Sequence, residues 1–335
     1  MTPLFSVILP CYNHGIYLQE AIASLEQSQE TRWEAIIIND GSTDGETLAI
    51  FEELRQRGYR VHDQANGGLA YARNVGIGLA QGEYILPLDA DNKIRPHYLS
   101  HSAEVLAARP EVGVVYGDME FFGEQIGRWE LPEFSLYRLL LANFIDACSV
   151  FRKTVWAQVG GFDENMPDRL GYEDWEFWLA VAGHGWQFAR IPAVVFDYRV
   201  RSDSMVARCK QPENQQKLVR YLCQKHQALY AQFLPDVLAE KEFLWFREQE
   251  RAETLRQRLQ VVETRLEKLE RAFVQSEEER AAAQLLGDRL QVEVTYTRAE
   301  AAQWREQVRA MESSKFWRLR RLWFWLKRRL GWRDP

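Results

Sequence analysis

The sequence predicts an α/β domain with a mostly parallel central sheet, followed by a long α-helical extension. Four short apolar runs typical of buried strands alternate with helical patterns in the first 120 residues. The strand-like runs are 6–9, 35–38, 84–88 and 113–116, and the helical patterns are 16–25, 46–57 and 69–80. Such alternation is typical of βαβ units. Beyond Leu255, apolar residues recur in alternate steps of four and three, which is a coiled-coil heptad pattern.

The composition excludes several classes of protein. The chain has 335 residues, 46% of them hydrophobic and 27% charged, with a net charge of −6. This is ordinary for globular domains, and about two structural units are expected. The acidic balance argues against a nucleic-acid partner. Four cysteines without C-x-x-C spacing are expected to be reduced thiols with no metal role. The N-terminus does not resemble a signal peptide, so a cytoplasmic location is expected.

Polar residues follow the first two strand-like runs. Residues 10–13 come after the first, and residues 39–44 come after the second. Ligands of parallel sheets bind at the carboxyl ends of the strands, so a site is expected there. Two simpler interpretations stay open, because Thr43 and Glu46 fit a helix capping box and Asp40 could form a turn.

Asp89 and Asp91 follow the third apolar run and are separated by one residue. Residues i and i+2 of an extended chain point to the same side, so the two carboxylates repel each other unless a cation joins them. A hard divalent ion such as Mg²⁺ or Mn²⁺ suits this pair and typically shares its site with phosphates. The alternative is a solvated, Asp-rich turn.

A glycine pair and an arginine mark the helical pattern over 69–80. Gly67 and Gly68 allow a sharp turn, and Asn66 could cap the helix that follows. Arg73 could reach a phosphate or an acidic neighbour. The alternative is a capped helix with a surface arginine.

Glu173 and Asp174 begin an aromatic helical segment that contains Trp175 and Trp178. Acidic residues at a helix N-terminus are favoured by the helix dipole, and that is the simpler interpretation. The functional interpretation makes one of them a general base, with aromatic rings that tune its basicity and stack on a sugar ring. Farther on, the arginines of segment 198–205 could fold over a diphosphate or be surface charges.

Together these motifs, in this order, resemble the family 2 glycosyltransferases. The matching set is VILPCYN, NDGSTD, NGGLAYARNVG, GEYILPLDAD, GGFDE, GYEDWEFW and YRVRSDSM, which covers about residues 5–206. The resemblance implies a GT-A fold, a nucleotide-sugar donor, a divalent cation (Mn²⁺ or Mg²⁺) and mostly inverting transfer. Two other functions remain to be weighed: a nucleotidyltransferase, and a non-catalytic coiled-coil adaptor with a relic transferase domain.

The resemblance also implies roles for individual residues. Asp40 would contact the nucleoside of the donor, and Pro10, Tyr12 and Asn13 would line the same pocket. Arg73 would lie near the nucleotide and diphosphate, Asp89 would face the ribose and the metal, and Asp91 would bind the metal. Asp174 would be the catalytic base, with Glu173 beside it. Many relatives have a histidine where this chain has Arg201, and an arginine there would contact phosphate directly.

The expected organisation has three parts: a glycosyltransferase domain over 1–234, a coiled-coil extension over 235–312, and a basic amphipathic aromatic helix over 313–335. The heptads favour a homo-oligomer slightly over a helix that folds back on the body. The basic, tryptophan-rich end suits the headgroups of an anionic membrane, with a protein-docking helix as the rival. The chain is therefore expected on the inner face of the cell membrane, acting on a glycan or lipid-linked acceptor.

Overall fold

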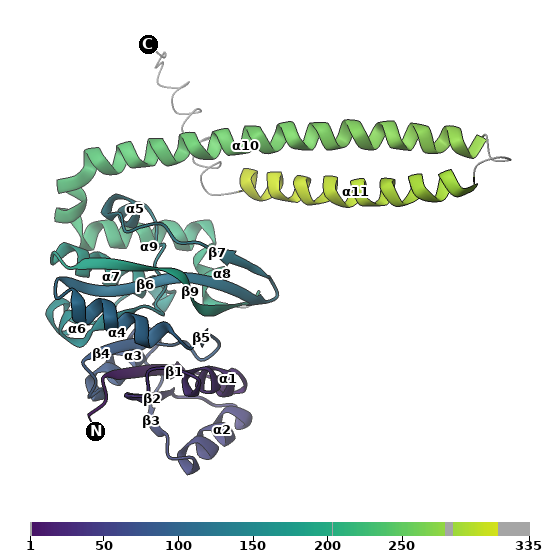
Figure 1. The fold of residues 1–335 in the computed structure, drawn as a ribbon. Coiled ribbons are helices and arrows are strands. Elements are labelled where there is room, and N and C mark those ends of the chain that lie inside the picture. The colour runs from purple at the N-terminus through teal and green to yellow at the C-terminus, as the bar shows by residue number, and fades with distance from the viewer. Residues whose placement is uncertain (1, 203, 279–283, 314–335) are drawn as a thin grey trace. The chain divides into compact units, whose positions relative to one another are not determined.

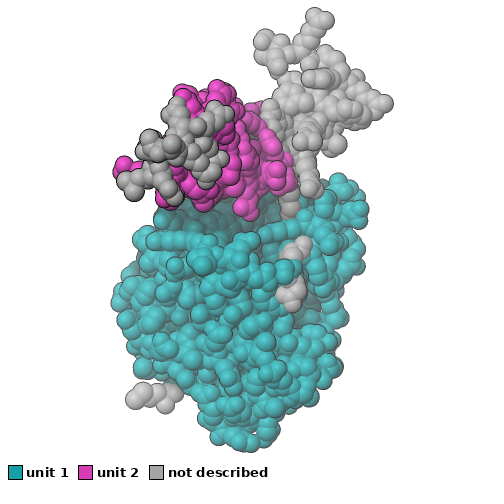
Figure 2. Space-filling model, turned by 90° about the vertical axis from the view of Figure 1, so that its right-hand side faces the viewer, with its two compact units in different colours: residues 1–237 teal, residues 238–335 magenta. Residues whose placement is uncertain are grey.

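A computed structural model describes residues 2–202, 204–278 and 284–313 of the chain. The chain divides into two compact units, Met1–Val237 and Leu238–Pro335, which Figure 2 shows in different colours. In the described residues, no helix is both long enough and apolar enough to cross a membrane. The expected basic helix over 313–335 lies almost wholly outside the described residues.

The elements of the first unit alternate between strands and helices from the N-terminus (Figure 1). The strands are β1 Phe5–Cys11, β2 Trp33–Asp40, β3 Arg60–Gln64, β4 Tyr84–Pro87, β5 Lys93–Ile94, β6 Val112–Gly123, β7 Gly127–Trp129, β8 Val150–Arg152 and β9 Gln187–Val200. The helices are α1 Gly15–Glu26, α2 Gly45–Gln56, α3 Leu69–Leu79, α4 Tyr98–Ala108, α5 Leu136–Leu141, α6 Lys153–Val159, η1 Pro167–Arg169, α7 Glu173–Gly183, α8 Met205–Cys209 and α9 Pro212–Lys225. Helix α10 (Gln227–Glu278) begins in this unit, and α11 (Gln284–Ser313) lies in the second.

The strands form one sheet in the order β3-β2-β1-β4-β8-β6-β9-β5, with β7 paired to β6. Strands β3, β2, β1 and β4 run parallel, as do β6 and β9, while β8 joins the two groups by antiparallel pairing. The predicted α/β class with a largely parallel sheet is therefore confirmed. Because the β1, β2 and β4 neighbours run in the same direction, their polar carboxyl ends come together at one edge.

The centre of the sheet is closely packed. Every residue of β1 is buried, as expected for a strand that is covered on both faces. Helix α3 packs on β1 and β2, and a Cβ atom on Gly76 would lie 2.4 Å from Cγ2 of Ile8. This close approach fixes α3 against the sheet.

The start of α2 differs by one residue from the expected capping box. The N-cap is Asp44, whose carboxylate accepts a hydrogen bond from the Thr47 backbone N–H at 2.7 Å. The hydroxyl of Thr47 in turn accepts from the backbone N–H of Gly15 at 2.9 Å, which ties α2 to the start of α1. Thr43 therefore does not cap this helix, and its backbone N–H is used elsewhere in the site.

In the second unit, α10 and α11 run side by side in opposite directions (Figure 1). Ion pairs join the two helices: Arg256 with Glu312, Arg305 with Glu263, Arg298 with Glu270 and Arg265 with Glu293. Among the described residues of this hairpin, five positions of the heptad pattern are buried together with Ala252, and these five are Leu255, Leu266, Val294, Thr297 and Ala301. The apolar positions that could pair two chains thus pair two helices of one chain.

Two glycines of α3 give a matched test of its packing. Gly76→Ala places a methyl group against Ile8 and should destabilise the protein by about 1–3 kcal/mol. Gly78→Ala meets nothing within 4 Å, so it should stabilise the helix by about 0.5–1 kcal/mol. Urea unfolding of both variants measures the difference. Equal effects of the two substitutions would show that α3 is not fixed by this contact.

Candidate active site

The loops after β1 and β2 are joined through Asn13. Its side-chain carbonyl accepts hydrogen bonds from the backbone N–H groups of Thr43 (2.8 Å) and Asp44 (3.2 Å). This requires a positive φ of 54° at Asn13, a conformation that asparagine tolerates better than most residues. The Tyr12 side chain is 46% exposed, whereas Pro10 is buried within β1. Tyr12 is therefore the group of this loop that is free to stack on a ligand.

Asp40, at the end of β2, is buried and holds the loop before α3. Its carboxylate accepts hydrogen bonds from the Gln64 side chain (2.8 Å) and from the backbone N–H groups of Gly67 (2.8 Å) and Gly68 (2.9 Å). The expectation that Asn66 caps α3 is wrong, because the N-cap is Gly68 with φ +89°. Only glycine adopts this φ readily, which explains Gly68, and a Cβ atom on Gly67 would lie 2.1 Å from Cδ1 of Tyr71.

Arg73 is the central group of the site. Its side chain is only 1% exposed, although guanidinium groups are seldom fully buried. It donates to Glu173 at 2.6 Å and to Asp89 at 2.7 Å, so it joins the end of β4 to the start of α7. The sequence left a phosphate or an acidic neighbour as partners for Arg73. The structure shows two acidic neighbours, Glu173 and Asp89. A surface position for this arginine is excluded.

Asp174 lies beside this bridge and is only partly exposed at the surface. The Asn143 side-chain amide donates to one of its oxygens at 2.8 Å, and the Trp175 backbone N–H donates to the other at 2.7 Å. Burial, together with the charges of Glu173 and Asp146, raises the pKa of Asp174. Since Glu173 is engaged by Arg73, Asp174 is the carboxylate of the pair that is better suited to take up a proton.

Two residues near Asp174 were missed in the sequence, Asn143 and Asp146. Burial and the charge of Asp89 raise the pKa of Asp146 to about 7. Its carboxylate accepts from the Cys148 backbone N–H at 2.8 Å. Both residues lie in the irregular segment between α5 and β8, where no periodic pattern marks them. In the sequence ANFIDACS of 142–149 the two polar residues stand among apolar ones, so no sequence signal marks them.

Asp89 and Asp91 follow β4 and lie close to the end of β9. Arg201 donates to Asp91 at 3.3 Å, and the side chain of Arg199 donates to the Asp91 backbone carbonyl at 3.1 Å. Burial and the charge of Asp89 raise the pKa of Asp91 to about 6. This mutual repulsion is the condition under which a divalent cation is favoured.

The donor set fits a cation that is shared with a ligand. In the described part of the chain, no group of three or more His, Cys, Asp or Glu side chains is arranged to hold a metal ion. Asp89 and Asp91 offer hard oxygen ligands for only part of a coordination shell. Mg²⁺ and Mn²⁺ are commonly held by one or two carboxylates together with phosphate oxygens and water, so the pair is compatible with such an ion.

The aromatic residues of α7 do not have the expected role. Trp175 is 3% exposed and Trp178 is fully buried, and their indole N–H groups donate to the backbone carbonyls of Leu139 (2.6 Å) and Ile145 (3.0 Å). The expectation that they stack on a sugar ring is therefore wrong. They position the start of α7 from within the core.

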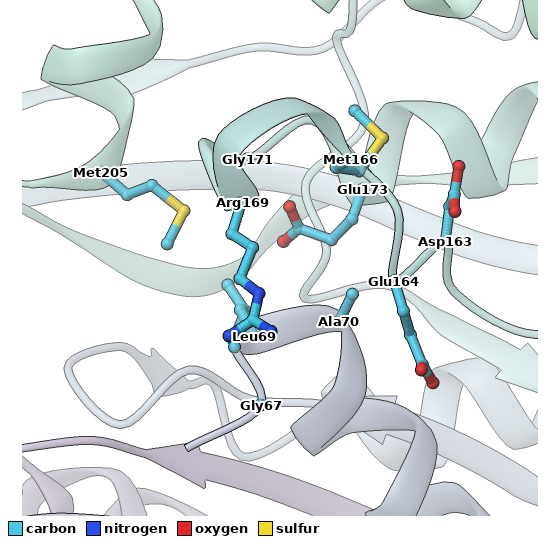
Figure 3. Close-up of a pocket in the computed structure, with 11 residues that line it drawn as sticks. Gly67, Leu69, Ala70, Asp163, Glu164, Met166, Arg169, Gly171, Glu173 and Met205 are labelled. Atoms are coloured by element: carbon cyan, nitrogen blue, oxygen red, sulfur yellow. The ribbon is translucent and has the colours of Figure 1, made fainter.

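A pocket lies between the start of α3 and the loop before α7 (Figure 3). Arg169 extends from one wall towards Leu69 on the other, and the Glu173 side chain points towards Arg169. Asp168, Arg169 and Tyr172 in this loop have positive φ values of 53°, 51° and 66°. Such strained backbone at non-glycine residues is concentrated at functional sites.

The comparisons with known proteins identify the family of the first part of the chain. Residues 6–158 match the model of the family described as Glycosyl transferase family 2. Residues 6–158 form a glycosyl transferase family 2 domain. This match agrees with the resemblance seen in the motifs, and it disfavours a nucleotidyltransferase.

Two curated relatives illustrate how far the similarity extends. The glycosyltransferase is 29% identical over 210 residues to the putative teichuronic acid biosynthesis glycosyltransferase TuaG of Bacillus subtilis, covering 61% of this chain and 81% of that protein. It is also 29% identical over 177 residues to chondroitin synthase of Pasteurella multocida, covering 51% of this chain and 18% of that protein. The chain thus spans less than a fifth of some relatives that it matches.

A solved structure shares the fold. The mannosyltransferase PcManGT from Pyrobaculum calidifontis, in complex with GDP-Man and Mn²⁺, superposes with a TM-score of 0.52 at 19% identity. The match covers 72% of the glycosyltransferase and 69% of that chain. At this level of identity the likeness establishes the GT-A fold.

Replacing Arg73 tests the central bridge. Arg73→Met leaves Glu173 and Asp89 without their cation, so the free energy of unfolding should fall by about 3–5 kcal/mol near neutral pH. The loss should shrink in mildly acidic solution, because protonation removes the unpaired negative charges. Urea unfolding at two pH values measures both effects.

Arg57→Met is the matched control for this experiment. Arg57 pairs with Glu26 at the surface, where both side chains are about 40% exposed. Its loss should cost less than about 1 kcal/mol at either pH. If Arg73→Met costs no more than this control, the bridge does not hold the site together.

Proposed function

We propose that this chain transfers a sugar from a nucleoside diphosphate sugar to a hydroxyl group of a glycan or lipid-linked acceptor, with inversion at the anomeric carbon. The observation that carries the proposal is the Arg73 bridge. It connects Asp89, on the side of the nucleotide loops, to Glu173, next to the candidate base Asp174. The buried guanidinium of Arg73 thus sets the position of the donor side relative to the acceptor side.

The donor side would be formed by the loops after β1 and β2. Tyr12 is exposed and can stack on a nucleobase. A carboxylate has about four lone-pair positions, and Asp40 uses three for Gln64, Gly67 and Gly68, which leaves one for a donor group of the nucleoside. Arg201, beside Asp91, would contact the diphosphate in place of the histidine of many relatives.

Asp89 and Asp91 would hold a divalent cation together with the diphosphate. When bound, the cation neutralises charge that develops on the leaving nucleoside diphosphate. Arg201 then adds a second positive group at the same place without being a ligand itself. The Mn²⁺ complex of PcManGT supports this assignment by analogy of fold.

On the acceptor side, Asp174 would take the proton of the attacking hydroxyl. Asn143 and the Trp175 backbone N–H fix the orientation of the carboxylate and still leave lone pairs on both oxygens. The raised pKa of Asp174 increases its basicity over that of an ordinary aspartate. Direct attack on the face opposite the leaving group inverts the configuration and needs no covalent nucleophile.

The relatives' names support a role in assembling surface polysaccharide. The glycosyltransferase domain would comprise residues 1–234, the helical extension 235–312 and the basic aromatic end 313–335. We expect that end to bring the enzyme to the inner face of an anionic membrane, where lipid-linked acceptors are available. A homo-oligomer formed through the extension would need a surface other than the heptad positions that are buried in the hairpin.

A screen of nucleotide sugars for hydrolysis tests the donor side. We expect at least one UDP- or GDP-sugar to be hydrolysed with Mn²⁺ or Mg²⁺ and not with EDTA, because the carboxylate pair alone repels a diphosphate. Asp91→Asn should lose most of this activity, and the exposed Asp236→Asn serves as control. Full activity of Asp91→Asn would contradict the metal assignment, and no turnover of any donor would contradict the function.

Asp174→Asn tests the base. The variant keeps the shape of the side chain but cannot accept the proton, so kcat should fall by about 10²–10⁴ while the donor still binds. In the wild type, kcat should rise with pH, because the raised pKa keeps part of Asp174 protonated at neutral pH; this rise should be absent in the variant. Steady-state rates over a pH series with the donor and acceptor measure both effects. If Glu173→Gln is inactive and Asp174→Asn is not, the two roles are reversed.

A further inference from the structure

The sheet carries a row of aromatic side chains next to the carboxylates that the mechanism uses. Tyr198 on β9 is paired in register with Phe121 on β6, and their rings are 6.1 Å apart in an edge-to-face arrangement. Phe121 is followed by Trp129 on β7, with ring centroids 6.5 Å apart. Trp129 pairs in register with Met119, two residues before Phe121, so the three rings lie on the same face of the sheet.

The inner end of this row is tied to the active site. The backbone N–H of Arg199, the residue after Tyr198, donates to the side chain of Asn92 at 3.0 Å, directly beyond Asp91. The nearby carboxylates of Asp146, Asp89, Asp91 and Asp174 add to burial in raising the pKa of Tyr198. The row therefore starts beside the reacting groups and extends outward along the sheet.

The outer end of the row is accessible. Trp129 is 42% exposed, although tryptophan side chains are highly buried on average. Opposite Phe121 lies Gly127, whose φ is not positive, and a Cβ atom at this position would meet Phe121 only at an ordinary 3.5 Å. The backbone does not demand a glycine there. Its missing side chain leaves one side of the half-buried Phe121 ring accessible.

The surroundings favour a sugar over a lipid as the occupant. The β6–β7 hairpin carries Glu120, Glu124 and Glu130 and one basic residue, Arg128, which pairs with Glu130 at 3.7 Å. Its net negative charge gives it no attraction to an anionic membrane. A sugar ring has an apolar C–H face that packs on an aromatic ring and hydroxyl groups at its rim that bond to polar neighbours.

We propose that Tyr198, Phe121 and Trp129 form a platform that binds sugar residues of the acceptor, so that the acceptor is an oligosaccharide chain and not a single sugar. This inference rests on the proposed transfer reaction and names the substrate class of its acceptor side. A pyranose ring is similar in size to a phenyl ring, so three rings in a row offer room for more than one sugar residue. The reacting hydroxyl lies at the Asp174 end, and the earlier residues of the chain extend towards Trp129.

The test uses an array of immobilised mono- to hexasaccharides with the full-length protein. Wild type should be retained by saccharides of two or more residues, and Trp129→Ala should bind them about tenfold more weakly, while Trp129→Phe keeps most of the binding. Gly127→Leu should also weaken binding, because it covers Phe121 and removes no ring. Tyr296→Ala, an exposed aromatic residue of the second unit, is the matched control and should bind as wild type.

Hydrolysis of the donor sugar separates this inference from the proposed function. The rate should be unchanged in Trp129→Ala and Gly127→Leu, which also shows that both variants fold. The platform is overturned if both variants bind saccharides as well as wild type does, or if the array retains no wild-type protein. It is also overturned if Trp129 is needed for retention on anionic vesicles instead. If the wild type hydrolyses no donor sugar, the transfer reaction is contradicted, whereas the saccharide binding measured on the array is not affected by that result.

Discussion

The burial of Arg73 between Glu173 and Asp89 is the interaction on which the rest of the site depends. Four carboxylates, Asp89, Asp146, Glu173 and Asp174, surround one guanidinium, and without it their charges would be uncompensated in a poorly solvated region. Arg73 is itself fixed, because α3 packs tightly on β1 and the loop that leads into α3 is held by Asp40. The fold therefore positions the Arg73 guanidinium, and this group holds the carboxylates of the site in place.

Much of the fold could be predicted from local patterns. The apolar runs in β1, β2, β4 and β6 and the periodicity of α1, α2 and α3 depend on burial against one sheet, and this leaves a clear trace in sequence. Strand β3 was missed, because Arg60–Gln64 is polar and only partly buried at the edge of the sheet. The predicted N-cap of α2 was one residue too early. Thr43 and Asp44 could both cap the helix, and the structure shows that Asp44 does so.

The site was predictable where a motif is contiguous and less so where it depends on tertiary contacts. Asp89, Asp91, Glu173 and Asp174 stand out in the sequence, but the partner that joins two of them, Arg73, is 100 residues from Glu173. Asn143 lies in a loop without periodicity, and only its contact with Asp174 gives it meaning. Trp175 and Trp178 were misread for a related reason: the sequence shows aromatic residues beside an acid, but not which face of the helix enters the core.

The helical extension shows how an apolar pattern can specify a contact without specifying the partner. A heptad stripe requires another helix opposite, and both a second chain and a second helix of the same chain satisfy it. The charges carry the missing information. Arg256, Glu263 and Glu270 rise in steps of seven along α10, and their partners Glu312, Arg305 and Arg298 fall in steps of seven along α11. Opposite charges that match in reversed order are the mark of an antiparallel pair, and this signal was present in the sequence.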